Sequence, residues 1–325
     1  MEKLIMKKKY IELMSKNIIS LFLVLIMALG QSKNVYAKGD ETSLPSTDQI
    51  HGIYVSAYVA GTKNMMEEMI THIDGSDINA VVIDVKNDEG KIVFDMKSDL
   101  IDELGAKNIL VKDMPGLIDT LHEHGVYTIA RCVAFRDPYI KDVEPEWMLR
   151  TADGEICEDN KGFYWMDPRN DDACDYLIEV ALSCKDAGFD EVQYDCVRFP
   201  TGITEEDLGM NGYGRRKAIN DFVRTAHAKL KSSGMPLSLD VFGTVINSKV
   251  DRNIVGQEYS WLSMGCEFLS PMIYPSHYYE GTMGNDYPDL YPYETIDAAM
   301  KYSETEQKTV NPNGKRVQAS VRPWL

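Results

Sequence analysis

One pattern recurs along the chain and restricts the folds that it can adopt: a helical segment ends at a glycine, and an apolar strand follows at once. The pattern is clearest in "HEHGVYTIA", "DAGFDEVQYD" and "SSGMPLSLD". In each, the glycine takes the position that favours it at the C-terminal end of a helix. Regular alternation of helices and strands with short connections predicts a parallel sheet covered by helices.

Apolar runs predict seven strands, at Gly52–Tyr58, Ala80–Lys86, Tyr127–Ala134, Glu191–Val197, Leu237–Gly243, Phe268–Tyr274 and Val317–Pro323. Helical patterns lie between them, clearest at Asn64–Ile73, Pro115–His124, Asp172–Ala187, Arg215–Ser232 and Tyr293–Lys301. Seven such units favour an α/β fold of the (β/α)₈ barrel type. A doubly wound open sheet is the alternative.

The C-terminal end of the sequence bears on this prediction. The chain stops at "VQASVRPWL", in or just after the seventh strand, whereas a barrel needs an eighth strand. A further βα unit takes about 30 residues, so we expect residues 51–325 to form a barrel that is incomplete at its C-terminus. The open edge would expose unpaired backbone groups.

The N-terminus predicts export. Six lysines lie within residues 1–37, together with the apolar run "IISLFLVLIMALG" and the small residues of "VYA" before a cleavage point after Ala37. The run is shorter than the roughly 20 residues of a membrane span, so a cleaved signal is favoured over an uncleaved anchor. Residues 38–50 read as a polar linker. We expect a secreted or cell-envelope protein that contacts the membrane only through an uncleaved signal.

Charge and cysteine content exclude several classes of function. Beyond residue 37 the chain holds 28 basic and 49 acidic residues, a net charge of −21, so nucleic acid is not an expected partner. The six cysteines show no CxxC spacing, so we expect no metal site. Buried thiols are the simplest interpretation, and export leaves a Cys157–Cys174 disulfide open.

Polar residues interrupt the apolar strands in a regular way. Alternate residues of a strand share a face, which pairs Asp84 with Lys86, Gln193 with Asp195, and Ser238 with Asp240. Each lies toward the C-terminal end of its strand, where (β/α)₈ enzymes build their active sites. The alternative is a buried ion network that only supports the barrel, which would cost several kcal/mol per ion unless every charge is paired.

Two carboxyl groups on neighbouring strands suit glycoside hydrolysis, so Asp195 and Asp240 are the candidate catalytic residues. We expect Arg198 or Arg131 to hold Asp195 ionised as nucleophile or base. A drier setting would keep Asp240 protonated as the acid. Asp84 competes for the role of the acid.

The rim of the barrel should bind the sugar. The long loop from Arg136 to Asn170 carries aromatic residues, among them Trp165, that suit stacking on sugar rings or pinning of the loop. The stretch "MIYPSHYY" places Tyr274 and His277 at the same rim. The full set of candidate substrate-binding residues is Asp84, Lys86, Arg131, Trp165, Arg198, Tyr274 and His277.

Eight motifs carry a resemblance to a known family: "HGIYVSAY", "VVIDVKNDEG", "HEHGVYTIARCVAF", "PEWMLRTADG", "WMDPRN", "DEVQYDCVRFP", "LSLDVFG" and "MIYPSHY". From about His51 to Leu325 the chain resembles the glycoside hydrolase domain family of bacterial secreted proteins, a (β/α)₈ group formerly classed as a domain of unknown function. The resemblance implies a glycosidase-like barrel acting on a polysaccharide, and Asp84, Asp195, Arg198 and Asp240 fall on matching motif positions. Asn87 departs from the family, where an aspartate is common, and the family's domain continues through an eighth strand.

The sequence therefore predicts an exported glycoside hydrolase that cleaves a cell-envelope glycan or exopolysaccharide with two carboxylates and no cofactor. The alternative is a catalytically silent barrel that binds carbohydrate in the cell envelope. An esterase or deacetylase is disfavoured because the chain has no GxSxG elbow and no metal-ligand cluster.

Overall fold

The computed structural model describes residues 44–325, except residues 48, 312 and 315–317. These residues belong to one unit, Ser43–Leu325. The predicted signal at residues 1–37 and the first part of the predicted linker lie outside the described residues. Among the helices that are described, none is long and apolar enough to cross a membrane.

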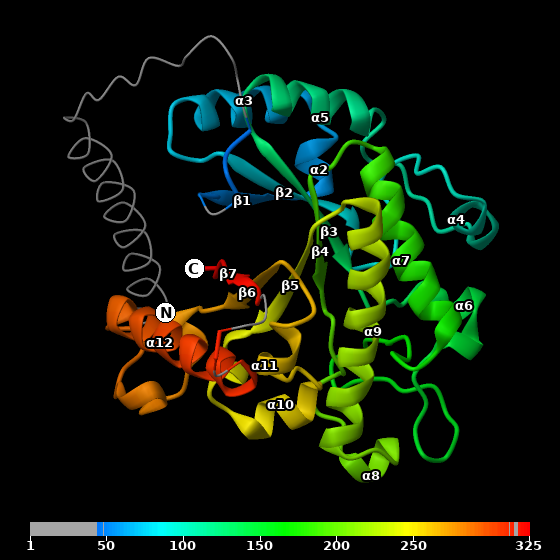
Figure 1. The fold of residues 1–325 in the computed structure, drawn as a ribbon. Helices are drawn as coiled ribbons and strands as arrows, with labels where there is room; N and C mark the ends of the chain where they lie inside the picture. Colours follow the sequence, from blue (N-terminus) through cyan, green and yellow to red (C-terminus); the bar gives the residue numbers. More distant parts are fainter. Residues whose placement is uncertain (1–43, 48, 312, 315–317) are drawn as a thin grey trace, which may run out of the picture. The chain divides into compact units, whose positions relative to one another are not determined.

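A single parallel sheet forms the centre of this unit, and its strands follow one another in chain order. The strands are β1 (Gly52–Val55), β2 (Ala80–Lys86), β3 (Tyr127–Val133), β4 (Glu191–Asp195), β5 (Leu237–Phe242), β6 (Phe268–Met272) and β7 (Ser320–Val321). Because the order never reverses, the sheet is not doubly wound. It curls into an incomplete (β/α) barrel, as the sequence predicts (Figure 1).

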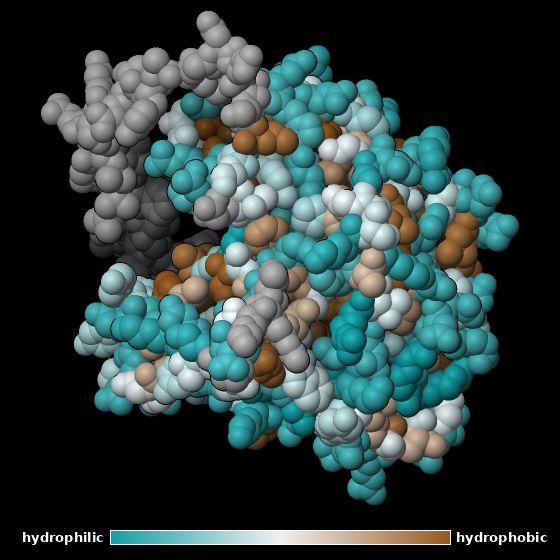
Figure 2. All heavy atoms as spheres, in the orientation of Figure 1, coloured by the Kyte–Doolittle hydropathy of each residue, from teal (hydrophilic) through white to brown (hydrophobic). Residues whose placement is uncertain are grey.

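Helices cover the outer face of the curled sheet (Figure 1). The longer ones are α3 (Lys63–Asp74), α5 (Met114–Glu123), α7 (Asp171–Asp186), α9 (Gly212–Ser233) and α12 (Pro292–Val310). Shorter helices fill the connections: α2 (Ala57–Ala60), α4 (Asp99–Leu104), α6 (Ile140–Val143), α8 (Glu205–Leu208), α10 (Lys249–Val255) and α11 (Tyr259–Leu262). Hydrophilic side chains dominate the helical surface seen in Figure 2, in keeping with the acidic composition.

The glycines of the repeated sequence pattern end helices as predicted. Gly125 follows α5 with a φ of 69°, Gly188 follows α7 with a φ of 101°, and Gly234 caps α9 with a φ of 79°. A side chain would be strained in this left-handed region, whereas glycine adopts it freely. Each glycine turns the chain from a helix into the next strand.

The end of the first strand differs from the prediction, which ran to Tyr58. The strand stops at Val55, and Ser56 caps the short helix α2 by accepting a hydrogen bond from the backbone N–H of Val59. The hydrogen bond from the Ser56 side chain to a free N–H stabilises the start of a helix. This stabilisation is greater than the strand propensity of the residues that follow.

Side chains of the sheet alternate between two apolar clusters. Val81, Ile83 and Val85 point outward into the large core that the helices cover. Val82 and Ile129 belong to a small cluster, which Trp324 packs against. Among the described residues, no strand pairs with the outer edge of β1 or β7, so the sheet does not close.

Lys86 ends β2 in a fully buried position. The register of β2 against β3 shifts between Asp84 and Lys86, a bulge of the kind that re-aims a side chain. The Lys86 ammonium lies 2.8 Å from a carboxylate oxygen of Asp137 and donates to the carbonyl oxygens of Val133 and Ala134. With neither partner exposed, the ion pair fixes the β2 and β3 ends to the loop that follows β3.

We therefore expect Lys86→Met to destabilise the protein by about 3–5 kcal/mol, because it leaves the Asp137 carboxylate buried without a counter-charge. Urea denaturation of the purified protein measures this change. Lys63→Met, at an exposed position of α3, is the control and should shift the midpoint little. An unchanged midpoint with weakened sugar binding would instead support the role of Lys86 as a substrate ligand.

Candidate active site

A cavity of about 370 Å³ lies at the C-terminal end of the sheet. Its walls come from β1 and β3 to β6, from the loop after β2, and from the segment after β7. The lining residues are Tyr54, Asp88, Arg131, Asp195, Asp240, Met272, Tyr274 and Trp324. The structure thus brings together four of the predicted site residues, Arg131, Asp195, Asp240 and Tyr274.

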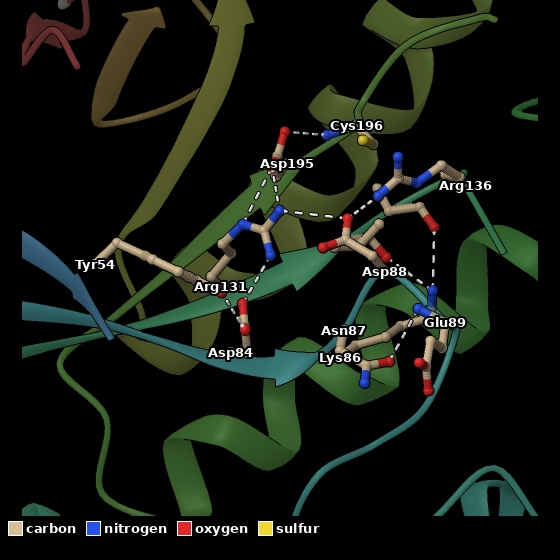
Figure 3. A network of polar contacts seen from close by, with 12 residues as sticks. Tyr54, Asp84, Lys86, Asn87, Asp88, Glu89, Arg131, Arg136, Asp195 and Cys196 are labelled. Atoms are coloured by element: carbon tan, nitrogen blue, oxygen red, sulfur yellow. Dashed lines mark hydrogen bonds and ion pairs between the residues drawn. The ribbon is translucent and has the colours of Figure 1, made fainter. Parts of the chain in front are cut away.

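Arg131 is the centre of the polar network in this cavity (Figure 3). Its guanidinium donates to Asp84 at 2.7 Å through Nη1, and to Asp195 at 2.6 Å through Nη2 and 3.1 Å through Nε. Burial lowers the pKa of Arg131, but the two carboxylates outweigh it and raise that pKa above its usual value. One fixed cation therefore bridges the carboxylates of β2 and β4.

The Asp84 carboxyl group is satisfied on both oxygens. Oδ1 accepts from Arg131, and Oδ2 accepts from the Tyr54 hydroxyl at 2.6 Å. Burial, followed by the bond to Asp84, raises the pKa of Tyr54 to about 12, so the phenol remains a donor. Asp84 itself is buried and does not line the cavity. It is placed to orient Arg131 rather than to meet a substrate.

Asp195 receives a further donor from the backbone. The N–H of Cys196 donates to Oδ1 at 2.6 Å, and Cys196 has a φ of 51°, in the left-handed region. A non-glycine residue held there costs about 1–3 kcal/mol and is typical of functional sites. Both oxygens of Asp195 thus accept hydrogen bonds, Oδ2 from Arg131 and Oδ1 from the Cys196 N–H.

Asp240 has the opposite environment. It is only 4% exposed, and its carboxyl group accepts one hydrogen bond, from the indole N–H of Trp324 at 2.8 Å. Burial, and after it the negative charge of Asp195, raises the pKa of Asp240 well above its usual range. The cavity therefore places its two carboxyl groups in opposite environments: Asp195 lies beside a cation, and Asp240 is buried next to a negative charge.

A buried glutamine fixes the strand end that carries Asp240. The Gln257 side chain accepts from the backbone N–H of Phe242 at 3.0 Å and donates to the carbonyl oxygens of Asp240 and Val197, at 3.3 and 3.4 Å. It joins the chain after β4 to the end of β5, which holds the two candidate catalytic carboxyls in register.

Arg198 and Trp165, both predicted to bind substrate, pack against each other and do not line the cavity. The Arg198 guanidinium lies 4.6 Å from the ring centres of both Trp165 and Phe242 and donates to the Phe199 carbonyl. Trp165 is 1% exposed and donates to Asp159 at 3.0 Å, which pins the long loop to the barrel. The ion pair with Asp195 comes from Arg131 and not from Arg198.

The structure also bears on three further predictions from the sequence, which concern His277, the cysteines and metal binding. His277 lies against Tyr274, with ring centres 5.1 Å apart, and lines a neighbouring cavity instead of the aspartate cavity. All six cysteines are free thiols, so Cys157 and Cys174 form no disulfide. Within the described ranges, no group of three or more His, Cys, Asp or Glu side chains is arranged to hold a metal ion.

Sequence reasoning missed four residues of the cavity: Tyr54, Asp88, Met272 and Trp324. Tyr54 and Met272 stand on predicted strands at positions that the face alternation could have identified. Asp88 pairs with Arg136 across two loops, and Trp324 reaches Asp240 from 84 residues away. Neither of these contacts leaves a local signal.

Comparison with known proteins identifies the family. Residues 52–325 match a family model described as "Putative glycosyl hydrolase domain", and the chain belongs to this family of glycosidase-like domains. No protein of curated function matches the chain.

Solved structures share the fold. A hypothetical protein from Ruminiclostridium thermocellum is 30% identical, with a TM-score of 0.52 over 58% of this chain and 97% of its own. The C-terminal domain of a "putative chitinase" from Desulfitobacterium hafniense is 17% identical, with a TM-score of 0.51 over 79% of this chain and 63% of its own. The PgaB glycoside hydrolase domain from Bordetella bronchiseptica is 11% identical, with a TM-score of 0.58 over 79% of this chain and 82% of its own.

The environment of Asp240 predicts how its pKa responds to substitution. Asp195→Asn removes the neighbouring negative charge and should lower the pKa of Asp240. Trp324→Phe removes the donor that stabilises the charged form and should raise it. Carbon-13 NMR titration of the Asp240 carboxyl group measures both shifts. A carboxyl group that titrates near the ordinary aspartate value of about 3.9 in the unsubstituted protein would contradict this assignment.

Proposed function

We propose that the protein is an exported glycoside hydrolase that cleaves a polysaccharide by a two-carboxylate mechanism, with Asp195 and Asp240 as the catalytic residues. One observation carries the proposal. In a single cavity, Asp195 accepts hydrogen bonds from the Arg131 guanidinium, while Asp240 is buried with a raised pKa. Glycoside hydrolysis requires this division between a carboxylate and a carboxylic acid.

In this mechanism Asp240 gives its proton to the glycosidic oxygen as the bond from that oxygen to the anomeric carbon breaks. Asp195 stabilises the positive charge that develops on the sugar. It then either attacks the anomeric carbon, forming a glycosyl-enzyme that water later hydrolyses, or removes a proton from the water that attacks directly. Both routes yield one new reducing end and one free hydroxyl group, and both consume one water.

The substrate of the proposal is a glycan of the cell envelope or an exopolysaccharide. The cavity is open to solvent beside exposed tyrosines, Tyr54 and Tyr279, whose rings suit contact with sugars. Family membership supports a carbohydrate substrate, and the sequence of residues 1–37 supports export. Two structural neighbours bear the names of a chitinase and a glycoside hydrolase domain, which fits a polymeric sugar substrate.

A specific observation favours the second candidate, a silent carbohydrate-binding barrel. Both oxygens of Asp195 accept strong hydrogen bonds, from Arg131 and from the Cys196 N–H. Such bonds reduce the basicity and nucleophilicity of a carboxylate. In that case the same cavity would bind a glycan without cleaving it.

The decisive experiment measures reducing ends released from a panel of cell-wall glycans and exopolysaccharides. We expect Asp195→Asn to abolish release and Asp240→Asn to reduce kcat by about 10²–10⁴-fold, the usual contribution of a general acid. Asp142→Asn is the matched control, because Asp142 is an exposed aspartate on α6 outside the cavity. If no glycan is cleaved but Asp195→Asn still binds one with unchanged affinity, the silent barrel is the correct function.

A further inference from the structure

Residues 320–324 lie beside β6, at the open edge of the curled sheet (Figure 1). The backbone pairing continues beyond β7, because the N–H groups of Arg322 and Trp324 each donate to a carbonyl oxygen of β6 at 3.0 Å. Among the residues that the structure describes, no strand pairs with the other edge of β7. Backbone hydrogen bonds to the sheet therefore hold this segment from one side.

Two side chains of this segment reach other strands of the sheet. Arg322 and Trp324 are two residues apart, so they share a face. The Trp324 indole N–H donates to Asp240 on β5, at 2.8 Å from Oδ1. The Arg322 guanidinium forms an ion pair with Glu191, the first residue of β4. Because β5 and β6 separate β4 from β7 in the sheet, this ion pair crosses the interior.

The Arg322 guanidinium has partners on two strands. Glu191 is fully buried, and its carboxyl group also accepts from the Tyr127 hydroxyl group at 3.3 Å. Burial raises the pKa of Glu191, and the positive charge of Arg322 is the strongest effect that opposes this rise. The guanidinium also lies 3.7 Å from the centre of the Phe268 ring on β6. Arg322 thus ties residues 320–324 to β4 as well as to β6.

Packing leaves room beside the Trp324 indole. A cavity of about 70 Å³ is lined by Trp324 and, among others, by Val82, Ile129 and Gln193. Trp324 lines the aspartate cavity as well. Atoms next to a void lose the contacts that neighbouring side chains would otherwise provide. The placement of the indole on Asp240 therefore depends on the directional bonds of its segment.

We propose that the ion pair between Arg322 and Glu191 positions the Trp324 indole on Asp240, which makes Arg322 a positioning residue for the acid of the proposed reaction. An indole N–H can only donate a hydrogen bond. With Oδ1 of Asp240 accepting from it, the proton that the acid transfers lies on Oδ2. Without the ion pair, the indole turns toward the small cavity and the carboxyl group loses its fixed orientation. The role of Asp240 as the acid rests on the proposed function, whereas the position of the indole does not.

The test replaces the ion pair by two apolar side chains, in the double variant Glu191→Met with Arg322→Met. Exchanging a buried ion pair for apolar residues of similar size is usually neutral or stabilising, so this variant should fold. Nitrogen-15 NMR follows hydrogen exchange of the Trp324 indole N–H, whose signal is assigned by its loss in Trp324→Phe. We expect exchange about tenfold faster in the double variant, the effect of one lost hydrogen bond.

The kinetic test uses a glycan that the unsubstituted protein cleaves. We expect kcat to fall about tenfold in the double variant, and no further when Trp324→Phe is added, because both changes remove the same contact. Lys217→Met with Asp221→Met is the matched control. It removes an exposed ion pair of α9 and should leave both the exchange rate and kcat unchanged.

Arg322→Lys provides a second variant, because it keeps a charge for the buried Glu191 but not the planar fork of the guanidinium. Its indole exchange rate should lie between those of the unsubstituted protein and the double variant. Exchange as slow in both variants as in the unsubstituted protein overturns the inference, and so do losses of kcat that add to that of Trp324→Phe.

Failure of the proposed function looks different. If the Trp324 indole exchanges faster in the double variant but the unsubstituted protein releases no reducing ends from any glycan, the positioning stands and the catalysis does not. Release of reducing ends together with an unchanged indole exchange rate gives the reverse result, which overturns the role of Arg322 and leaves the glycosidase.

Discussion

The position of the Arg131 guanidinium determines the electrostatics of the whole site. Both Asp84 and Asp195 contact this cation. Arg131 stands on β3 and bonds to Asp84 on the neighbouring strand β2 and to Asp195 on the neighbouring strand β4. Three buried or half-buried charges are tolerable there only because each has a partner. Asp84 and Tyr54 hold the far side of the cation, so Arg131 faces Asp195 with a fixed geometry.

The contrast between Asp195 and Asp240 follows from this arrangement. Arg131 bonds directly to Asp195 but not to Asp240, whose carboxyl group, among the residues that the structure describes, accepts from a neutral indole N–H alone. The stabilised charge on Asp195 in turn opposes ionisation of Asp240. One cation that contacts Asp195 and not Asp240 therefore gives two aspartate side chains different electrostatic environments. The strained backbone of Cys196 adds to the separation by turning an N–H toward Asp195.

Face alternation placed Asp195 and Asp240 toward the C-terminal ends of their strands, and both line one cavity, because a regular strand has a period of two. It failed at Lys86, where a bulge after Asp84 breaks the period and turns the ammonium into the core. The alternation of helices and strands predicted the parallel sheet but left a doubly wound order open, which the observed order β1 to β7 excludes. Trp324 could not be predicted as a ligand of Asp240, since the contact depends on how far the sheet curls, and no local spacing encodes that curvature.

The two cavities give β6 and its loop a double role. Met272 and Tyr274 line both the cavity of the carboxyl pair and the neighbouring, largely apolar cavity. The loop after β6 packs closely on the end of β5, because a side-chain carbon at Gly243 would collide with the Tyr278 hydroxyl oxygen and with the Met272 carbonyl. This contact ties the loop after β6 to the strand that carries Asp240.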